Sequence, residues 1–267
     1  MKIIRFLSEQ GKTLCGAYHE KQPGRSRILR GDIIAGFQET GEEAAIRQLL
    51  APVEPPNVLA LGLNYRKHAE ETNVSYPEIP VLFIKANTTV IGPGATILLP
   101  AAGPDRVDYE CELAIVIGKK AKNVTKSAAM EYIFGYTCAN DVSARDWQIE
   151  KQKKQWARGK SFDTFCPLGP WIVTKDEIPN PNTLKIRTIL NGEVLQDSNT
   201  SDMIFDVPTI VSDLSSSMTL LPGTVILTGT PEGVGFTRKP ALYLKDGDSV
   251  TIEIEGVGKL ANPVRCE

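Results

Sequence analysis

Two glutamates separated by a single residue stand directly before an apolar run. Glu110 and Glu112 precede the aliphatic segment Leu113–Ile117. If this stretch is a strand, both carboxylates point to the same side, because successive side chains alternate along a strand. Two carboxylates at a buried edge repel each other and lose hydration, and a divalent cation relieves both effects. Their oxygen atoms suit magnesium, manganese or calcium rather than zinc. The competing interpretation is that both glutamates lie on the solvent face of a strand and bind no metal.

A third acidic residue follows another apolar stretch. Asp141 comes after the predicted strand Tyr132–Thr137 and before the predicted helix Ala144–Gln155. Aspartate at this position often caps a helix. The alternative is that Asp141 supplies a third carboxylate to the same cation.

A histidine and a glutamate form a second candidate group. The chain has only 2 histidines, and one of them, His68, stands three residues before Glu71. On a helix these two side chains are neighbours. A carboxylate beside an imidazole fixes its tautomer and raises its basicity, which produces a general base. The competing interpretation is a polar surface helix with a chance pair.

Two further segments have residue types suited to binding an anion. Lys160 stands among turn residues and aromatics in GKSFDTFCPLGP, where its charge could neutralise a substrate carboxylate or enolate. The stretch Leu227–Gly235 is rich in glycine and threonine just after a predicted strand. Backbone N–H groups in such a turn can point at an anion, although glycine turns are common.

The elements that position these residues are mostly strands. Short apolar runs recur between Gly, Pro, Asn or Asp and predict strands. The runs are Val58–Leu63, Val81–Ile84, Thr96–Leu99, Leu113–Ile117, Tyr132–Thr137, Trp171–Val173, Leu184–Leu190, Val225–Thr228 and Ser249–Ile254. Asn191 and Gly192 predict a hairpin turn. Helical pieces are fewer, at Lys126–Tyr132, Ala144–Gln155 and Val207–Ser217, so we expect an α+β, β-rich fold.

The first part of the chain reads as a small separate unit. Ile3–Phe6 and Leu14–Tyr18 predict strands joined by a turn around Gly11, and Gly41–Leu50 has the spacing of a helix. Prolines then end any helix, at Pro52, Pro55 and Pro56. We therefore predict a small N-terminal α/β domain over residues 1–52 and a catalytic domain over residues 53–267.

Composition excludes several classes of protein. The 267 residues carry a formal net charge of −2, and the densest basic stretch, Lys151–Lys160, is short and mixed with polar residues. A solvated helix face or a substrate-facing lysine explains this stretch better than a nucleic-acid surface. The 5 scattered cysteines form no Cys-x-x-Cys pair, and no apolar run reaches the length of a membrane span. These features predict a cytoplasmic protein that binds neither nucleic acid nor membrane.

Together these segments resemble the fumarylacetoacetate hydrolase family. The matching order is NYRKHAEE, DYECELAIVIGKK, ANDVSARDWQ, GKSFDTFCPLGPW, LNGEVLQDSNTSDMIF and LPGTVILTGTPEGVG, over roughly residues 57 to 265. Six motifs in one order are highly specific. The stretches KSFDTFCPLGP and FTRKPALYLKDGD are most similar to the small domain-containing proteins of the type 2 branch.

The resemblance implies a mixed β-sandwich roll, a homodimer and a bound Mg²⁺ or Mn²⁺ ion. It implies metal ligands at Glu110, Glu112 and Asp141, and a catalytic His68–Glu71 dyad on a short mobile helix. It also implies residues that hold or polarise the substrate, at Lys160, Gln148, Thr230, Tyr65 and Lys85. We expect the segment at residues 66–80 to close as a lid over a bound dicarboxylate.

Two departures from the family pattern argue against fumarylacetoacetate as the substrate. Fumarylacetoacetases carry a fourth acidic ligand where this chain has Leu61, and an arginine where it has Pro77. The leading prediction is a metal-dependent hydrolase that cleaves a C–C bond in small 1,3-diketo acids of the acylpyruvate or diketo-sugar-acid type, with His68 activating water. The alternative is an oxaloacetate keto–enol tautomerase or decarboxylase at the same site. A third possibility is a member that only binds a metal or a partner.

Overall fold

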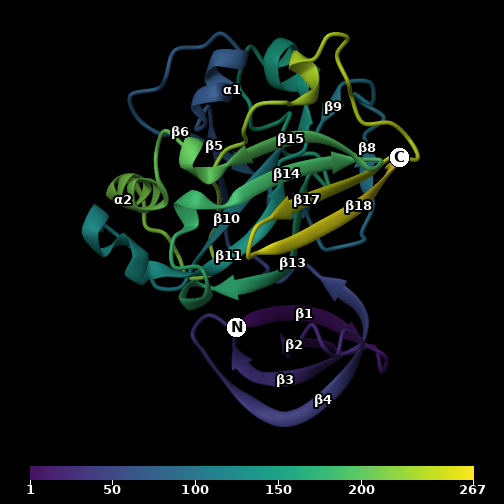
Figure 1. The fold of residues 1–267 in the computed structure, drawn as a ribbon, viewed down its shortest axis with the longest axis vertical. Coiled ribbons are helices and arrows are strands. Elements are labelled where there is room, and N and C mark those ends of the chain that lie inside the picture. Colours follow the sequence, from purple (N-terminus) through teal and green to yellow (C-terminus); the bar gives the residue numbers. More distant parts are fainter.

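Strands are the main regular elements of the chain, and most of them lie in two sheets (Figure 1). The structure is a computed structural model that describes residues 1–267. Its strands are β1 (Lys2–Ser8), β2 (Thr13–Tyr18), β3 (Arg25–Asp32), β4 (Gly36–Leu50), β5 (Val58–Gly62), β6 (Val81–Lys85), β7 (Val90–Ile91), β8 (Ile97–Leu99), β9 (Val107–Asp108), β10 (Cys111–Ile117), β11 (Ile133–Asn140), β12 (Ser143–Ala144), β13 (Cys166–Thr174), β14 (Lys185–Leu190), β15 (Glu193–Asn199), β16 (Val225–Leu227), β17 (Ser249–Ile254) and β18 (Gly258–Cys266). The α-helices are α1 (Arg66–Glu71) and α2 (Val207–Ser217).

The larger sheet runs through the whole molecule. It has 11 strands, ten of them in the order β2-β3-β4-β1-β13-β11-β10-β16-β5-β6, with β7 paired to β13. The smaller sheet has 5 strands in the order β15-β14-β17-β18-β8, and β9 and β12 form a separate ribbon. Residues of both sheets share one hydrophobic core, so the smaller sheet covers one face of the larger sheet around β10 and β11.

Strand β10 is buried on both faces, which explains its continuous apolar run. Leu113 and Ile115 belong to the core shared with the smaller sheet. Ala114 and Val116 belong to a second core on the opposite face, together with residues of β5, β13 and β16. Since Glu112 has the parity of Ala114, its side chain leaves β10 on the face turned away from the smaller sheet.

Most predicted elements are confirmed, including the hairpin and one helix. β14 and β15 meet at Asn191 and Gly192, whose φ values of 52° and 88° fit a type I′ turn. Asp206 caps helix α2, because its side chain accepts a 2.9 Å hydrogen bond from the N–H of Thr209. The predicted helix at Ala144–Gln155 is shorter, because regular turns cover only Asp146–Lys151 as a π-helix.

The helix predicted at Gly41–Leu50 is wrong. These residues form the second half of the long strand β4, which pairs with β3 on one side and β1 on the other. Glu43–Ala45 pair with β3 and Ile46–Leu50 pair with β1. This tertiary pairing overrides the helix-forming tendency of the sequence, because propensity is a weak preference. The N-terminal part of the chain is consequently all β rather than α/β.

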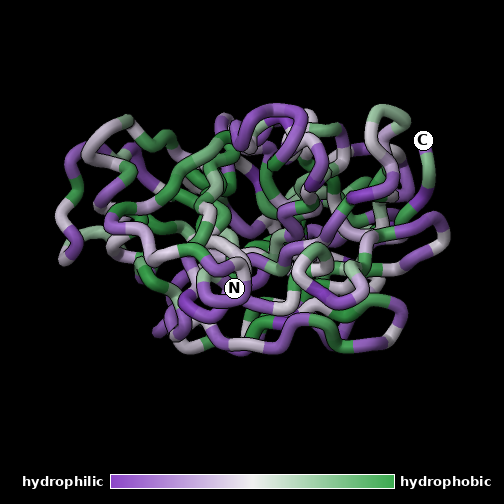
Figure 2. Tube along the Cα trace, turned by 90° about the horizontal axis from the view of Figure 1, so that it is seen from above, coloured by the Kyte–Doolittle hydropathy of each residue, from purple (hydrophilic) through white to green (hydrophobic).

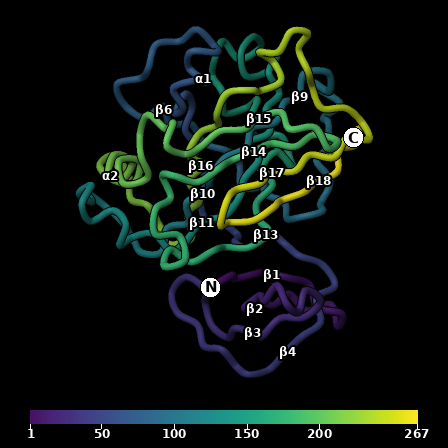
Figure 3. The backbone as a smooth tube through the Cα atoms, viewed as in Figure 1, coloured from purple at the N-terminus to yellow at the C-terminus, as the bar shows by residue number.

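Strands β1–β4 gather in their own lobe at one end of the molecule, as the tube in Figure 3 shows. The lobe is still joined to the large sheet, since Ile3 of β1 pairs with Ile172 of β13. The predicted boundary near residue 52 falls in the extended segment between β4 and β5. We keep the division into two domains as a proposal.

Hydrophobic stretches run through the middle of the molecule, and hydrophilic stretches predominate in the outer loops (Figure 2). All 5 cysteines are free thiols. No helix combines the length and the apolar composition needed to cross a bilayer.

Candidate active site

The register between β10 and β11 brings two predicted ligands together. Cys111 pairs with Asn140, so the residues just beyond each strand, Glu110 and Asp141, are also adjacent. The N–H of Asp141 donates a 2.9 Å hydrogen bond to the carbonyl of Glu110. The π-helix that follows has Arg145 at its N-cap and no side-chain capping hydrogen bond, so the alternative that Asp141 caps it is wrong.

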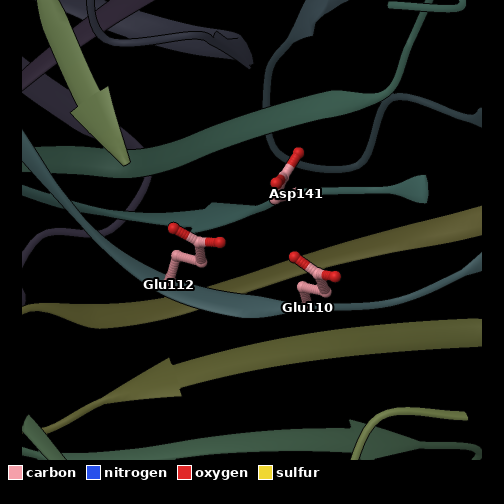
Figure 4. Close-up of side chains that lie close together, drawn as sticks. All are labelled: Glu110, Glu112 and Asp141. Atoms are coloured by element: carbon pink, nitrogen blue, oxygen red, sulfur yellow. The ribbon is translucent and has the colours of Figure 1, made fainter. Parts of the chain in front are cut away.

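The three carboxylates of Glu110, Glu112 and Asp141 converge on one point (Figure 4). One oxygen from each lies within 4.8 Å of the others. Glu110 is 5% exposed, and Glu112 and Asp141 are fully buried. The alternative that the two glutamates decorate a solvent-facing strand is thus wrong.

Two buried lysines face this cluster. The Nζ of Lys160 lies 2.8 Å from Glu110 Oε2 and 2.6 Å from Asp141 Oδ2. The Nζ of Lys85 lies 2.6 Å from the other oxygen of Asp141. Both lysines neutralise carboxylates that would otherwise be buried with uncompensated charge.

An arginine holds the cluster from the other side. Arg145 Nη1 lies 2.7 Å from Glu110 Oε1, and its Nε donates a 2.9 Å hydrogen bond to Asp108. Asp108 also accepts hydrogen bonds from the N–H groups of Gly235 and Phe236. Arg145 and Asp108 therefore fix the orientation of Glu110.

The two glutamates of the cluster have opposite electrostatic environments. Burial alone would raise the pKa of Glu110, but the charges of Lys160 and Arg145 lower that pKa to about 2. Burial, followed by repulsion from Asp141 and Glu110, raises the pKa of Glu112 well above its usual range. Glu112 is the carboxylate that lacks a cationic partner.

The residues present fit a divalent cation. The Oε2 of Glu112 accepts a 2.5 Å hydrogen bond from the N–H of Gly229, whereas its buried Oε1 has no partner. A buried carboxylate oxygen without a partner is costly, and a cation among three carboxylates satisfies it. The all-oxygen donor set suits magnesium or manganese.

The predicted dyad is formed in the structure. His68 Nδ1 lies 3.2 Å from Glu71 Oε2 across one turn of α1. The second oxygen of Glu71 accepts hydrogen bonds from the N–H of Gly233 at 3.0 Å and from the hydroxyl of Thr237 at 2.8 Å. Glu71 is therefore held by the chain after β16, and it orients the His68 ring.

The glycine-rich stretch after β16 does present backbone N–H groups to anions, as its sequence predicts. The anions are carboxylates of the protein itself: Gly229 donates to Glu112 and Gly233 to Glu71. This stretch thus links the cation site to the dyad.

A cavity of about 290 Å³ joins the two groups. His68, Glu110 and Lys160 all line it, together with the predicted substrate-binding residues Gln148 and Thr230. Tyr65 and Lys85 are buried but do not line it. Lys85 instead contacts Asp141, and a substrate-binding role for Tyr65 stays a prediction.

Four residues of the site were not singled out from the sequence, although two of them carried a signal. Asp108 has the same strand alternation as Glu110, and Arg145 lies inside the motif that contains Asp141. Trp156 lines the cavity from a loop and Phe236 from the short 3-10 helix Gly235–Thr237, and no local sequence pattern predicts either position.

The fold and the site define a β-rich enzyme with a buried carboxylate cluster, a candidate cation site, beside a histidine–carboxylate dyad. The family model described as fumarylacetoacetate (FAA) hydrolase C-terminal matches residues 57–265. The chain belongs to the fumarylacetoacetate hydrolase family, as its motifs predict.

Named relatives are similar over most of the chain. The identity is 48% to a fumarylacetoacetate hydrolase domain-containing protein 2 homolog of Dictyostelium discoideum, covering 82% of this chain and 74% of that protein. It is 49% to the mitochondrial oxaloacetate tautomerase of Xenopus laevis, covering 81% of this chain and 68% of that protein. Because that relative is named as mitochondrial, a cytoplasmic location for this chain stays a prediction.

Solved structures share the whole fold. A 5-carboxymethyl-2-hydroxymuconate delta-isomerase from Mycobacterium smegmatis is 43% identical and superposes with a TM-score of 0.88, and each chain is covered to 100%. A 2-hydroxyhepta-2,4-diene-1,7-dioate isomerase from Mycobacterium marinum is 42% identical, with a TM-score of 0.86, covering 100% of this chain and 99% of that one. The predicted β-rich roll is thereby confirmed.

Proposed function

We propose that this protein is a magnesium- or manganese-dependent keto–enol tautomerase of small 2-keto acids of the oxaloacetate type. One observation carries the proposal. The His68 ring lines the same cavity as Glu110 and Lys160, while the Nδ1 of His68 contacts the carboxylate of Glu71. A base, a cation site and a buried ammonium group therefore face one small substrate.

The dyad moves the proton. When Nδ1 of His68 carries its proton and donates it to Glu71, Nε2 is free to accept a proton. In the keto form of the substrate, His68 takes a proton from carbon 3, and the electron pair of that C–H bond forms the enol double bond. The negative charge then lies on the 2-oxygen, which becomes the enol hydroxyl when protonated His68 gives this proton to it, and His68 is neutral again. The reverse sequence converts enol to keto.

The buried charges stabilise the enolate. Lys160 lines the cavity and contacts Glu110 and Asp141, so its ammonium group is fixed before substrate arrives. A divalent cation held by Glu110, Glu112 and Asp141 would supply Lewis-acid polarisation of the 2-keto oxygen and would orient the substrate carboxylate.

The relatives favour proton transfer over hydrolysis. Those named as oxaloacetate tautomerases are 49% identical to this chain, and solved structures with the same fold are named as isomerases. Isomerisation and tautomerisation both move protons and require no attacking water. These similarities support the tautomerase more than the C–C hydrolase, which is the leading prediction from the sequence alone.

Hydrolysis of a 1,3-diketo acid stays as the second candidate, because one observation favours it. The cavity wall includes the apolar side chains of Leu63, Phe83 and Trp156, which suit an acyl tail. The same His68–Glu71 dyad would then take a proton from water.

The experiment follows the enol absorbance of freshly dissolved oxaloacetate with purified protein and magnesium or manganese. We expect catalysed loss of enol without pyruvate, and loss of catalysis in EDTA. Release of pyruvate and carbon dioxide would identify a decarboxylase instead. Cleavage of acetylpyruvate, with enol loss no faster than in buffer, would replace the tautomerase by the hydrolase.

A further inference from the structure

The cavity is lined by cations of two kinds. Arg145 and Lys160 are buried at 4% and 2% exposure, and both are paired with carboxylates. Lys154 is exposed at the rim, and it is the one lysine or arginine lining the cavity that forms no ion pair. Its charge is therefore available to a ligand.

The loop around Lys154 has a defined and strained conformation. Lys153 and Lys154 both have left-handed φ values, of 49° and 65°. Two adjacent non-glycine residues in this region are uncommon and cost free energy, and such strain is concentrated at functional sites. Backbone hydrogen bonds from Lys153 to Glu150 and from Gln155 to Gln152 close the turn.

Trp156 anchors this loop against the cavity wall. Its ring packs edge-on against Phe83, with 5.8 Å between the ring centroids. A Cβ added to Gly62 would lie 2.0 Å from the Trp156 ring, so only glycine leaves room for this contact. The anchored indole fixes the position from which the Lys154 side chain reaches the cavity rim.

The charges around the carboxylate cluster leave a second carboxylate of the substrate without a cationic partner. Asp108, Glu110, Glu112 and Asp141 face the cations Lys85, Arg145 and Lys160, so four carboxylates oppose three cations. A divalent cation would turn the net charge from −1 to +1, and the carboxylate next to the 2-keto group would bring it to zero. A second substrate carboxylate has no counter-charge in the buried part of the site.

We propose that Lys154 binds the distal carboxylate of the substrate and so selects 2-keto dicarboxylates over monocarboxylic acids. The inference rests on the proposed function, because it takes the 2-keto acid end of the substrate to lie at the carboxylate cluster. A cavity of about 290 Å³ is at the small end of ligand sites, which suits a short dicarboxylate.

The test measures equilibrium binding and needs no turnover. Malate and 2-hydroxybutanoate differ only in that the second has a methyl group in place of the distal carboxylate. Calorimetry in magnesium compares both acids on wild type, Lys154→Met, Lys154→Arg and the control Lys153→Met. Lys153 shares the left-handed backbone and does not line the cavity.

We expect Lys154→Met to weaken malate binding on the order of tenfold, the effect of one charge-assisted contact at an exposed rim. The affinity for 2-hydroxybutanoate should not change, Lys154→Arg should retain most of the malate affinity, and Lys153→Met should behave as wild type. Equal losses for both acids, or no loss for malate, would overturn the role of Lys154 and leave the tautomerase proposal standing. Failure of wild type to bind either acid would overturn both.

Discussion

The ammonium group of Lys160 lies 2.6 Å from a carboxylate oxygen of Asp141, and both side chains are buried. The same group lies 2.8 Å from Glu110, so one lysine contacts two of the three carboxylates of the cluster. This contact links the stability of the fold to the chemistry of the site, because the lysine also lines the cavity.

Lys160→Met should destabilise the protein most strongly when no cation is present. Breaking a buried ion pair costs about 3–5 kcal/mol, because the partner charge is left uncompensated. Magnesium should restore part of this loss. Thermal unfolding in EDTA and in magnesium measures it, with Lys259→Met as control, since Lys259 pairs with Glu253 at 67% side-chain exposure. Equal melting temperatures for wild type and Lys160→Met in EDTA would contradict the prediction.

Glu112→Gln should abolish the stabilisation that magnesium gives to the folded protein. The Oε1 of Glu112 is buried without a partner, and the substitution removes its charge while keeping its shape. We expect loss of turnover, weaker magnesium binding and a folded protein at least as stable as wild type in EDTA, because an unpaired buried carboxylate is costly. Melting curves against magnesium concentration measure this, with the exposed Glu131→Gln as control. Wild-type activity in micromolar metal would show that this strand does not supply the ligands.

His68→Asn should slow enol loss by about 10²–10⁴-fold, the usual contribution of a general base. Glu71→Gln should have a smaller effect, because it leaves the imidazole in place and removes only its orienting charge. Magnesium binding should stay unchanged in both variants, since neither residue belongs to the carboxylate cluster. Steady-state kinetics and calorimetry separate the two effects. Activity of His68→Asn within tenfold of wild type would assign the proton transfer to another group.

The docking of α1 should weaken in acid because of Glu71. Burial alone would raise the pKa of Glu71, but hydrogen bonds from His68, Thr237 and Gly233 lower it below its ordinary value of 4.5. Ionised Glu71 thus contributes stability that is present above pH 4.5 and lost as the pH falls below it. The difference in unfolding free energy between wild type and Glu71→Gln should shrink over that range. The control Glu193→Gln, at an exposed position, should show no such trend. A free-energy difference between wild type and Glu71→Gln that grows in acid would contradict the prediction.

Residues 66–80 should become more protected when a dicarboxylate binds. Hydrogen bonds tie Glu71 to Gly233 and Thr237, whereas most side chains after the helix, including Tyr76 and Ile79, are exposed. Segments with few buried contacts open at low cost, so ligand contacts have a large effect on their closure. Hydrogen exchange with and without oxalate and magnesium measures this. Equal, strong protection in both states would show a fixed helix and remove the lid from the mechanism.

Features that depend on neighbouring residues were predictable from the sequence. Glu110 and Glu112 share a face because strand side chains alternate, and His68 meets Glu71 because residues three apart are adjacent on a helix. The hairpin at Asn191 and the helix Val207–Ser217 follow from equally local rules. The family motifs then supplied the order of these parts along the chain.

The fold of the N-terminal strands was harder to predict from the sequence. Gly41–Leu50 has the residue types of a helix, yet it is a strand because its first residues pair with β3 and its last residues pair with β1. The local preference is worth a few tenths of a kcal/mol per residue, about the size that tertiary pairing overrides. No local pattern reveals which strands will be its neighbours.

By itself, the sequence determined that Glu110 and Glu112 share one side of the chain and that His68 stands beside Glu71, because these pairs are set by backbone periodicity. Only the tertiary structure decided what surrounds them. The β10–β11 register places Asp141 beside Glu110, Lys85 reaches Asp141 from 56 residues away, and Arg145 joins Asp108 to the cluster. These contacts depend on strand register and on the burial of charge, and both are settled when distant segments pack together.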